Sequence, residues 1–239
     1  MLSKEEFQAH IDSGFNIIPV IEDLPVENQT PLTLYSQVSK KNNTFLLESV
    51  EGGDKWSQYS IIGFNCSDTI KVTGNIVELK NSNKVTSITS DDPLGEIQKI
   101  TSSFKSPNVI DLPRFHGGYV GFFAYESARY AEKRISDLSS KGSKFKKHMP
   151  EIFLVKAEQL VVYDNFNNSA QVIFNADPAK HSYEVVQERI NEMKTYFSSS
   201  SNLEELKFKE PKGSIHFESN FKKEEYLDAV NTIKNYIKE

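Results

Sequence analysis

Several features common in proteins are scarce or missing from this sequence, and each absence narrows the possible functions. Cys66 is the only cysteine among 239 residues, so no disulfide can form within the chain, which fits a reducing compartment. No stretch approaches the ~20 consecutive apolar residues of a membrane span. The first ten residues, MLSKEEFQAH, carry charges where a signal peptide needs an apolar core. We therefore predict a cytoplasmic protein with no membrane partner.

Positive charge is also in deficit. The net charge is -5 and the isoelectric point is about 5.7, whereas a nucleic-acid-binding protein normally presents a basic face. The one basic cluster, residues 141–147, is short, and we interpret it as a solvated loop. No nucleic-acid partner is expected.

Motifs for metal binding or nucleophilic catalysis are missing as well. No histidine lies three or four residues from another and none neighbours Cys66, so the sequence offers no compact metal cluster. There is no G-x-S-x-G turn and no phosphate-binding glycine loop. The paired carboxylates Asp91-Asp92 and Glu224-Glu225 fit capping and helix-dipole roles. We predict no catalytic residue and no metal ligand in this chain.

The chain does contain clear periodic patterns. Period-two runs rich in β-branched residues predict an antiparallel meander between residues 45 and 90. Pro19 keeps the extended segment 16–22 near a sheet edge. Further strands are predicted over 115–125, 151–163 and 170–174, and helices over 3–13, 30–38, 93–102, 126–134, 181–197 and 222–239. The fold class is α+β: mainly antiparallel β-sheet with several flanking helices.

Two segments are less ordinary. Residues 115–125, FHGGYVGFFAY, hold three glycines in the most apolar part of the sequence, and we interpret them as a core strand closely approached by another backbone. The last helix, 222–239, has an apolar face that needs something to pack on. Periodicity leaves two alternatives open for it: it packs back on the preceding sheet, or it is the first helix of a further domain.

The stretch FLLESVEGGDKWSQYSIIG, residues 45–63, places Glu48 and Ser49 directly after an apolar run and before a glycine pair. Pattern alone fits an ordinary β-hairpin whose strand ends on a surface carboxylate. The alternative is that the two polar groups bind a ligand, and pattern alone slightly favours the first interpretation.

Three motifs that follow one another along the chain favour the ligand-binding interpretation of Glu48 and Ser49 instead. FLLESVEGGDKWSQYSIIG and FHGGYVGFFAYE resemble the N-terminal signature of anthranilate synthase component I, within the chorismate-utilising enzymes. HFESNFKKEEYLDAVNTIKNYIKE resembles the segment that opens the chorismate-binding catalytic region of that family. The resemblance covers the chain almost from end to end.

The resemblance implies an enzyme of tryptophan biosynthesis, a carbon–oxygen lyase that converts chorismate and ammonia to anthranilate and pyruvate with Mg²⁺. A glutamine amidotransferase subunit, component II, supplies the ammonia, and tryptophan inhibits by feedback. On this match Glu48 and Ser49 bind tryptophan. Residues 1–209 are the regulatory domain, and 210–239 are the start of the catalytic domain, cut short. We expect this chain to bind no Mg²⁺ and to be inactive alone.

One departure and two alternatives accompany the match. Many family members carry a basic residue just before the Y-S pair, where this sequence has Gln58, which weakens any cationic contact from that position. Aminodeoxychorismate synthase component I shares the fold and is the first alternative. A stand-alone amino-acid-binding module is the second. If the catalytic half is missing, the chain exposes apolar surface, and we expect association.

Overall fold

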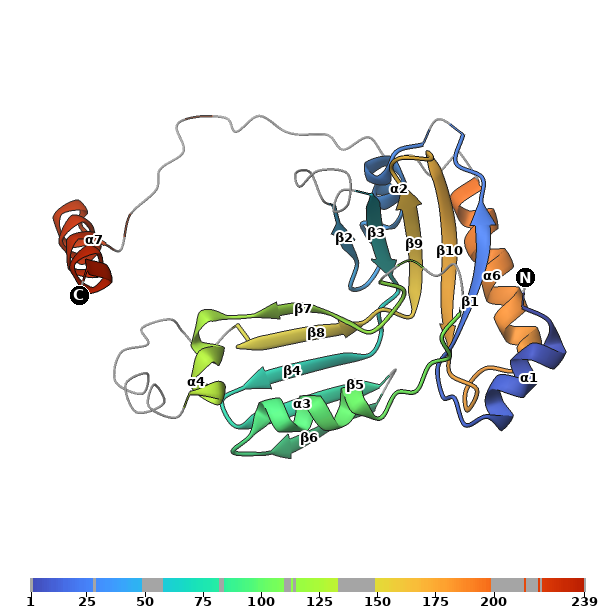
Figure 1. Cartoon of the computed structure of the whole chain (residues 1–239), viewed down its shortest axis with the longest axis horizontal. Helices are drawn as coiled ribbons and strands as arrows, with labels where there is room; N and C mark the ends of the chain where they lie inside the picture. Colours follow the sequence, from blue (N-terminus) through green and yellow to red (C-terminus); the bar gives the residue numbers. More distant parts are fainter. Residues whose placement is uncertain are drawn as a thin grey trace. The chain divides into compact units, whose positions relative to one another are not determined.

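The computed structural model describes residues 2–27, 29–48, 58–81, 84–109, 113, 115–132, 149–198, 213, 219 and 221–238 (Figure 1). The helices are α1 (Lys4–Asp12), α2 (Pro31–Val38), α3 (Pro93–Ser102), α4 (Ala128–Ala131), α6 (Tyr183–Ser198) and α7 (Lys223–Lys238), with a 3₁₀ turn η1 (Tyr125–Ser127). The chain divides into two compact units, Met1–Glu205 and Leu206–Glu239. Both sheets lie in the first unit, and α7 lies in the second.

The first sheet is antiparallel, in the order β1-β10-β9-β3-β2. Its strands are β1 (Ile18–Leu24), β2 (Phe45–Leu47), β3 (Tyr59–Phe64), β9 (Gln159–Asp164) and β10 (Ser169–Ala176). One face packs on α1, α2 and α6 and forms the largest core, which includes Phe7, Leu34, Val161, Phe174, Ile190 and Phe197. The opposite face holds a smaller cluster around Leu160, Val162 and Ile173.

The second sheet is also antiparallel, in the order β6-β5-β4-β8-β7. Its strands are β4 (Thr69–Thr73), β5 (Ile76–Asn81), β6 (Lys84–Thr89), β7 (Tyr119–Phe123) and β8 (Ile152–Lys156). Helix α3 covers one face, where Ile97 packs with Ile70, Val72, Val77, Ile152 and Leu154. The α+β fold class predicted from the sequence is confirmed.

Helix starts follow the predicted capping residues closely. Ser3 accepts a hydrogen bond from the Glu6 amide, and Thr30 accepts one from the Thr33 amide, with Pro31 in the first turn. Asp92 caps α3 by accepting from the Gly95 amide at 2.9 Å, which confirms its predicted capping role. Each cap satisfies one of the amide groups that a helix start leaves without a partner.

The predicted meander over 45–90 is wrong as a single sheet. All five strands form, but β2 and β3 belong to the first sheet and β4 to β6 belong to the second. Strand β3 pairs with β9, about a hundred residues further along, instead of with β4. Period-two patterning specifies which side chains face inward, but it does not specify which strand is the neighbour.

The predicted core strand over 115–125 also needs correction. The strand is β7, only Tyr119–Phe123, and it is the outer strand of the second sheet. Phe122 and Phe123 are 40% and 55% exposed. The predicted helix over 126–134 is one short turn, α4, preceded by η1.

Helix α7 confirms the helix predicted over 222–239. It buries none of its residues, and the exposed apolar side chains along it include Tyr226, Leu227, Ile233, Tyr236 and Ile237. Glu224 and Glu225 lie in its first turn, where acidic side chains favour the helix dipole, as predicted. Within the described residues, no helix has the length and apolar character that crossing a bilayer requires.

Candidate functional site: the β2–β3 edge

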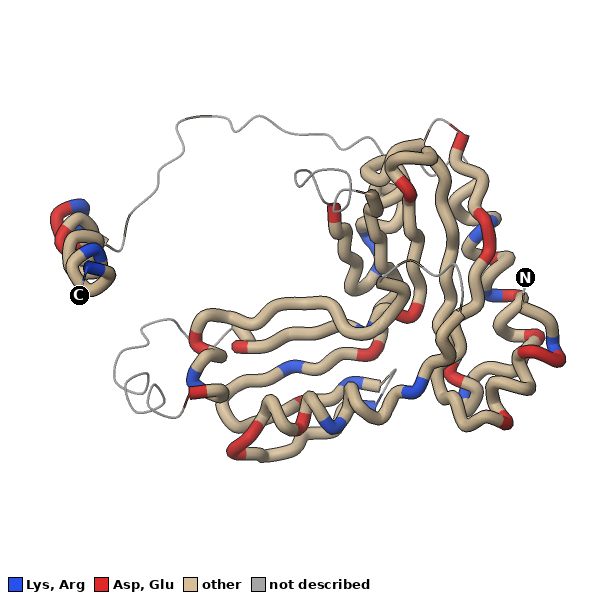
Figure 2. The backbone as a smooth tube through the Cα atoms, viewed as in Figure 1, with Lys and Arg blue, Asp and Glu red and all other residues tan. Residues whose placement is uncertain are grey.

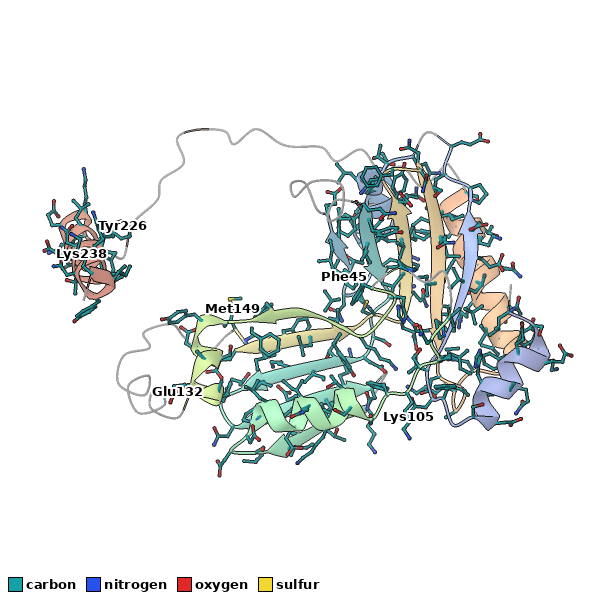
Figure 3. The ribbon with its side chains drawn as sticks, in the orientation of Figure 1. Phe45, Lys105, Glu132, Met149, Tyr226 and Lys238 are labelled. Atoms are coloured by element: carbon teal, nitrogen blue, oxygen red, sulfur yellow. The ribbon has the colours of Figure 1, made fainter. Side chains whose placement is uncertain are left out.

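Strand β2 is the outer strand of the first sheet and carries the first half of the signature stretch. It pairs antiparallel with β3, with Phe45 opposite Gly63 and Leu47 opposite Ile61. Figure 3 labels Phe45 at this edge of the sheet. Glu48 follows the strand directly and is exposed. Ser49 lies outside the described residues, as do 50–57, so the geometry of the site rests on Glu48 and the two strands.

Gly63, the glycine of the Y-S-I-I-G run, leaves room for an aromatic ring. A side chain on Gly63 would overlap the ring of Phe45, which extends from the neighbouring strand β2 over Gly63 on β3. Cross-strand neighbours of this kind stabilise a strand pair through their side chains. The two halves of the signature are therefore linked physically, because the glycine of one half makes space for the phenylalanine of the other.

The Glu48 carboxylate has no partner among the described residues: no hydrogen bond and no ion pair holds it there. Leu47 beside it is 43% exposed. An exposed carboxylate next to an exposed apolar side chain presents both an anionic and an apolar contact at the sheet edge. This is a chemical combination that suits a ligand with an ammonium group and an apolar body.

Gln58, the residue just before the Y-S pair, forms hydrogen bonds with Asp164 at the neighbouring turn and with Tyr59. Its amide donates to Asp164 Oδ2 at 3.3 Å and to the Tyr59 hydroxyl at 2.9 Å. Burial alone raises the pKa of Asp164, but hydrogen bonds from Asn167, Gln58 and the Phe166 amide lower it below its usual value. Position 58 thus stabilises an ionised Asp164 at the β9–β10 turn.

The face of the first sheet that carries Phe45 is only partly covered. Tyr59, Ile61 and Ile21 lie on it, and each is half-buried. Beside Tyr59 a small cavity of about 200 Å³ reaches Asp164 and Gln171. This partly covered apolar face borders the candidate site.

The glycine-rich second motif has the close backbone approach predicted for it. A side chain on Gly121 would overlap the backbone carbonyl of Phe153 on β8. One on Gly117 would meet the Asn175 amide, which donates to the His116 carbonyl at 2.7 Å and to the Ala157 carbonyl at 3.1 Å. These glycines therefore serve packing of the strand and its approach loop.

The remaining candidates fit structural roles. His116 Nδ1 lies 3.1 Å from the Pro113 carbonyl, and Cys66 is fully buried. Across the part of the chain that is described, no group of three or more His, Cys, Asp or Glu side chains is placed to hold a metal ion. Sequence reasoning missed the contacts of Gln58, because its partner Asp164 lies 106 residues away in the sequence.

Comparison with known proteins decides the family. The family described as chorismate binding enzyme matches residues 42–239. The chain belongs to the chorismate-binding enzyme family. The match includes both signature motifs and the terminal helix.

Several curated relatives are anthranilate synthase component 1 proteins. Those of Neisseria meningitidis serogroup B and Pseudomonas aeruginosa are 34% and 33% identical to this chain, each over 99% of it and 48% of the relative. That of Aquifex aeolicus is 32% identical over 99% of this chain and 47% of the relative. This member of the chorismate-binding enzyme family spans about half the length of the curated relatives it matches.

A solved structure supports the fold. The crystal structure of anthranilate synthase component I from Streptococcus pneumoniae TIGR4 aligns with a TM-score of 0.53 at 20% identity. The alignment covers 88% of this chain and 43% of that chain. At this identity the likeness extends to the fold alone.

Proposed function

We propose that this chain is the N-terminal, feedback-regulatory part of anthranilate synthase component I, a cytoplasmic enzyme of tryptophan biosynthesis. The complete enzyme makes anthranilate and pyruvate from chorismate and ammonia, and component II supplies the ammonia from glutamine. The observation that carries the proposal is the exposed, unpaired carboxylate of Glu48 among the described residues at the signature edge. The component 1 relatives match along 99% of the chain.

Tryptophan is the proposed ligand of this edge. Glu48 would accept hydrogen bonds from the ammonium group, and Ser49 would hydrogen-bond the polar groups beside it. Charge-assisted hydrogen bonds of this kind contribute roughly 1.5–3 kcal/mol each. The exposed Leu47 would contact the apolar part of the ligand. The rest of the pocket would come from the half of the protein that follows this chain in its relatives.

In this proposal Mg²⁺ takes part in the reaction of the complete enzyme, where a bound metal ion would stabilise developing negative charge. The described residues of this chain provide no cluster of metal ligands, so we assign none of them to Mg²⁺. In this proposal the metal and the chorismate are bound by the following half, and this chain alone is inactive.

Turnover of chorismate tests the proposal for the chain alone. The 239-residue chain is incubated with chorismate, ammonia and Mg²⁺, and anthranilate is followed by its fluorescence. We expect no anthranilate above the level without protein. Clear, protein-dependent fluorescence would contradict the assignment of the chemistry to the following half.

Tryptophan binding tests the regulatory role and separates it from a stand-alone amino-acid-binding module. Half a pocket binds weakly, so calorimetry with this chain should give no micromolar affinity, which corresponds to about -8 kcal/mol. In the chain joined to the remaining half of a component 1 relative, Glu48→Gln should relieve tryptophan inhibition. Glu27→Gln, an exposed carboxylate beyond the opposite edge strand, is the matched control.

The joined protein also separates the two enzyme assignments, because anthranilate as the product supports the proposal and aminodeoxychorismate as the product supports the alternative. Micromolar tryptophan binding by the chain alone, abolished by Glu48→Gln, would favour the binding module instead.

A further inference from the structure

A second groove lies on the helix-covered face of the first sheet, opposite to the face that carries Phe45 and Leu47. Its volume is about 200 Å³. It lies between α6, the segment that follows α2 and one end of the sheet. The side chains that matter here are Lys41, Phe64, Gln159, Arg189, Glu192, Met193 and Tyr196.

Lys41 in this groove has no anionic partner. Its ammonium nitrogen lies 3.9 Å from the centre of the Tyr196 ring and 5.8 Å from that of Phe64. Among the described residues, no carboxylate lies within 4 Å of it, whereas Lys4, Lys71, Lys99 and Lys194 each have one. Partial burial lowers the pKa of Lys41. The aromatic faces stabilise the cation but leave its hydrogen-bond donors for a ligand.

Gln159 contributes a polar group at an unusual position. It stands in the sheet between Phe64 on β3 and Phe174 on β10, on the face that forms the main core. Its side-chain oxygen accepts from Asn65 Nδ2 at 3.0 Å. Its side-chain nitrogen meets no acceptor among the described residues, although it lines the groove. An amide placed in an otherwise apolar row therefore keeps a donor for something else.

Arg189 on α6 adds a second cation and sets the charge of the groove. Its Nη1 donates to Glu192 Oε2 at 2.8 Å, which leaves the other donors of the guanidinium. Lys41 and Arg189 contribute two positive charges and Glu192 one negative charge, so the lining residues carry a net charge of about +1 near pH 7. The net positive charge favours a negatively charged ligand.

The volume of the groove and its lining residues indicate how large the ligand is and that part of it is apolar. Pockets for drug-sized ligands usually measure roughly 300–1,000 Å³, so this groove suits something more compact. Met193, Tyr196 and Phe64 supply apolar and aromatic surface. We propose that the groove binds a compact organic carboxylate with an apolar or aromatic body, held by Lys41, Arg189 and the Gln159 amide. This site shares no residue with the proposed tryptophan site at Glu48 and Ser49.

Binding of benzoate to the 239-residue chain tests this inference. Benzoate carries one negative charge on an aromatic body, and benzamide is its neutral counterpart. Calorimetry or chemical-shift titration should show saturable benzoate binding in roughly the millimolar range or tighter. Benzamide and inorganic phosphate should bind at least about tenfold more weakly, since the first lacks the charge and the second lacks the apolar body that Met193, Tyr196 and Phe64 would contact.

Two variants locate the site. Lys41→Gln should weaken benzoate binding at least about tenfold, while Lys40→Gln, at the exposed neighbouring lysine, should leave it unchanged. Gln159→Glu keeps the acceptor for Asn65 but brings a carboxylate into the groove, so it should abolish benzoate binding even if Lys41→Gln fails to fold. No saturable benzoate binding to the wild type, equal binding of benzamide, preference for phosphate, or binding unchanged in both groove variants would each overturn the inference.

Discussion

The ring of Phe45 on β2 occupies the space over Gly63 on β3 that a side chain at position 63 would need. Gly63→Ala should therefore destabilise the protein, because the ring must move or β2 must shift outward. Overpacking of this kind typically costs about 1–3 kcal/mol. For a chain of this length, thermal unfolding should shift down by about 2–4 °C per kcal/mol, measured by circular dichroism.

Truncation of the ring provides the control. Phe45→Ala removes the group that blocks position 63, so Gly63→Ala should cost much less in that background than in the wild type. A double-mutant cycle measures this difference as a coupling free energy, about 0.5–3 kcal/mol for residues in contact. Equal costs in both backgrounds would show that the contact does not explain the glycine.

Local features of the fold, such as helix starts, could be predicted from the sequence, but the pairing of strands could not. Ser3, Thr30 and Asp92 predict helix starts correctly, because each capping hydrogen bond joins two residues only three positions apart in the sequence. The pairing of β3 with β9 joins residues about a hundred apart, and nothing in period-two patterning selects it over β4. The exposed position of β7 escaped prediction for the same reason, since apolar composition does not distinguish a central strand from an outer one.

The two candidate sites also differ in whether their residues lie close together in the sequence. Glu48 was found through a contiguous motif, because the signature keeps its residues together in the sequence. The groove with Lys41 was not found, because Lys41, Gln159 and Arg189 come from three distant segments and each is unremarkable in its own stretch. Only the fold places the three side chains around one cavity.

A half-buried polar cluster joins Glu151, at the start of β8, to Arg129, Tyr130 and the β4–β5 turn. The Glu151 carboxylate accepts from Arg129 at 2.6 Å, from the Gly74 amide at 2.9 Å and from the Tyr130 hydroxyl. Glu151→Ala should leave the Gly74 amide without its acceptor and remove the carboxylate partner of Arg129, although Tyr130 can still donate to the Gly74 carbonyl. It should lower the free energy of unfolding by about 1–3 kcal/mol, measured by urea denaturation. Glu96→Ala, which removes a carboxylate bonded only to an exposed lysine among the described residues, is the control and should cost well under 1 kcal/mol. A similar cost for both variants would contradict the importance of the cluster.

The buried thiol predicts a loss of stability in alkaline solution. Burial, with a smaller contribution from the Glu158 carboxylate, raises the pKa of Cys66 from 9.0 to about 12. Above pH 9 the unfolded chain therefore binds fewer protons at this thiol than the folded chain does, so stability falls as pH rises from about 9 towards 12. Between about pH 8 and 10 the loss should be on the order of 1 kcal/mol.

Two variants isolate this effect. In Cys66→Ala the fall in stability between about pH 8 and 10, measured by urea denaturation at each pH, should be smaller by that amount. Tyr119→Phe is the matched control, because burial raises the pKa of Tyr119 from 10.0 to about 12 and its effect begins a pH unit later. An identical pH profile for Cys66→Ala and the wild type would show that the thiol titrates equally in both states.

The outer strand β7 predicts association of the isolated chain. No charged residue lies along Tyr119–Phe123, as Figure 2 shows, and β7 has β8 as its single neighbour in the described sheet. Phe123 is 55% exposed, and Met149, labelled in Figure 3, is 74% exposed. Unpaired strand edges with apolar side chains and no charge favour pairing with another chain. Light scattering should therefore give a mass above the 27.2 kDa of one chain.

A charge on this strand should reverse the association. Phe123→Lys places a lysine at the exposed edge, which natural sheets use to prevent edge pairing, so the scattering mass should fall towards that of the monomer. Val85→Lys makes the same change on β6, the opposite outer strand, where Val85 is 57% exposed and lysine is already present at position 84. If β7 is the contact, the Val85 variant keeps the wild-type mass. A monomeric wild type, or an unchanged mass for Phe123→Lys, would instead show that β7 does not pair between chains.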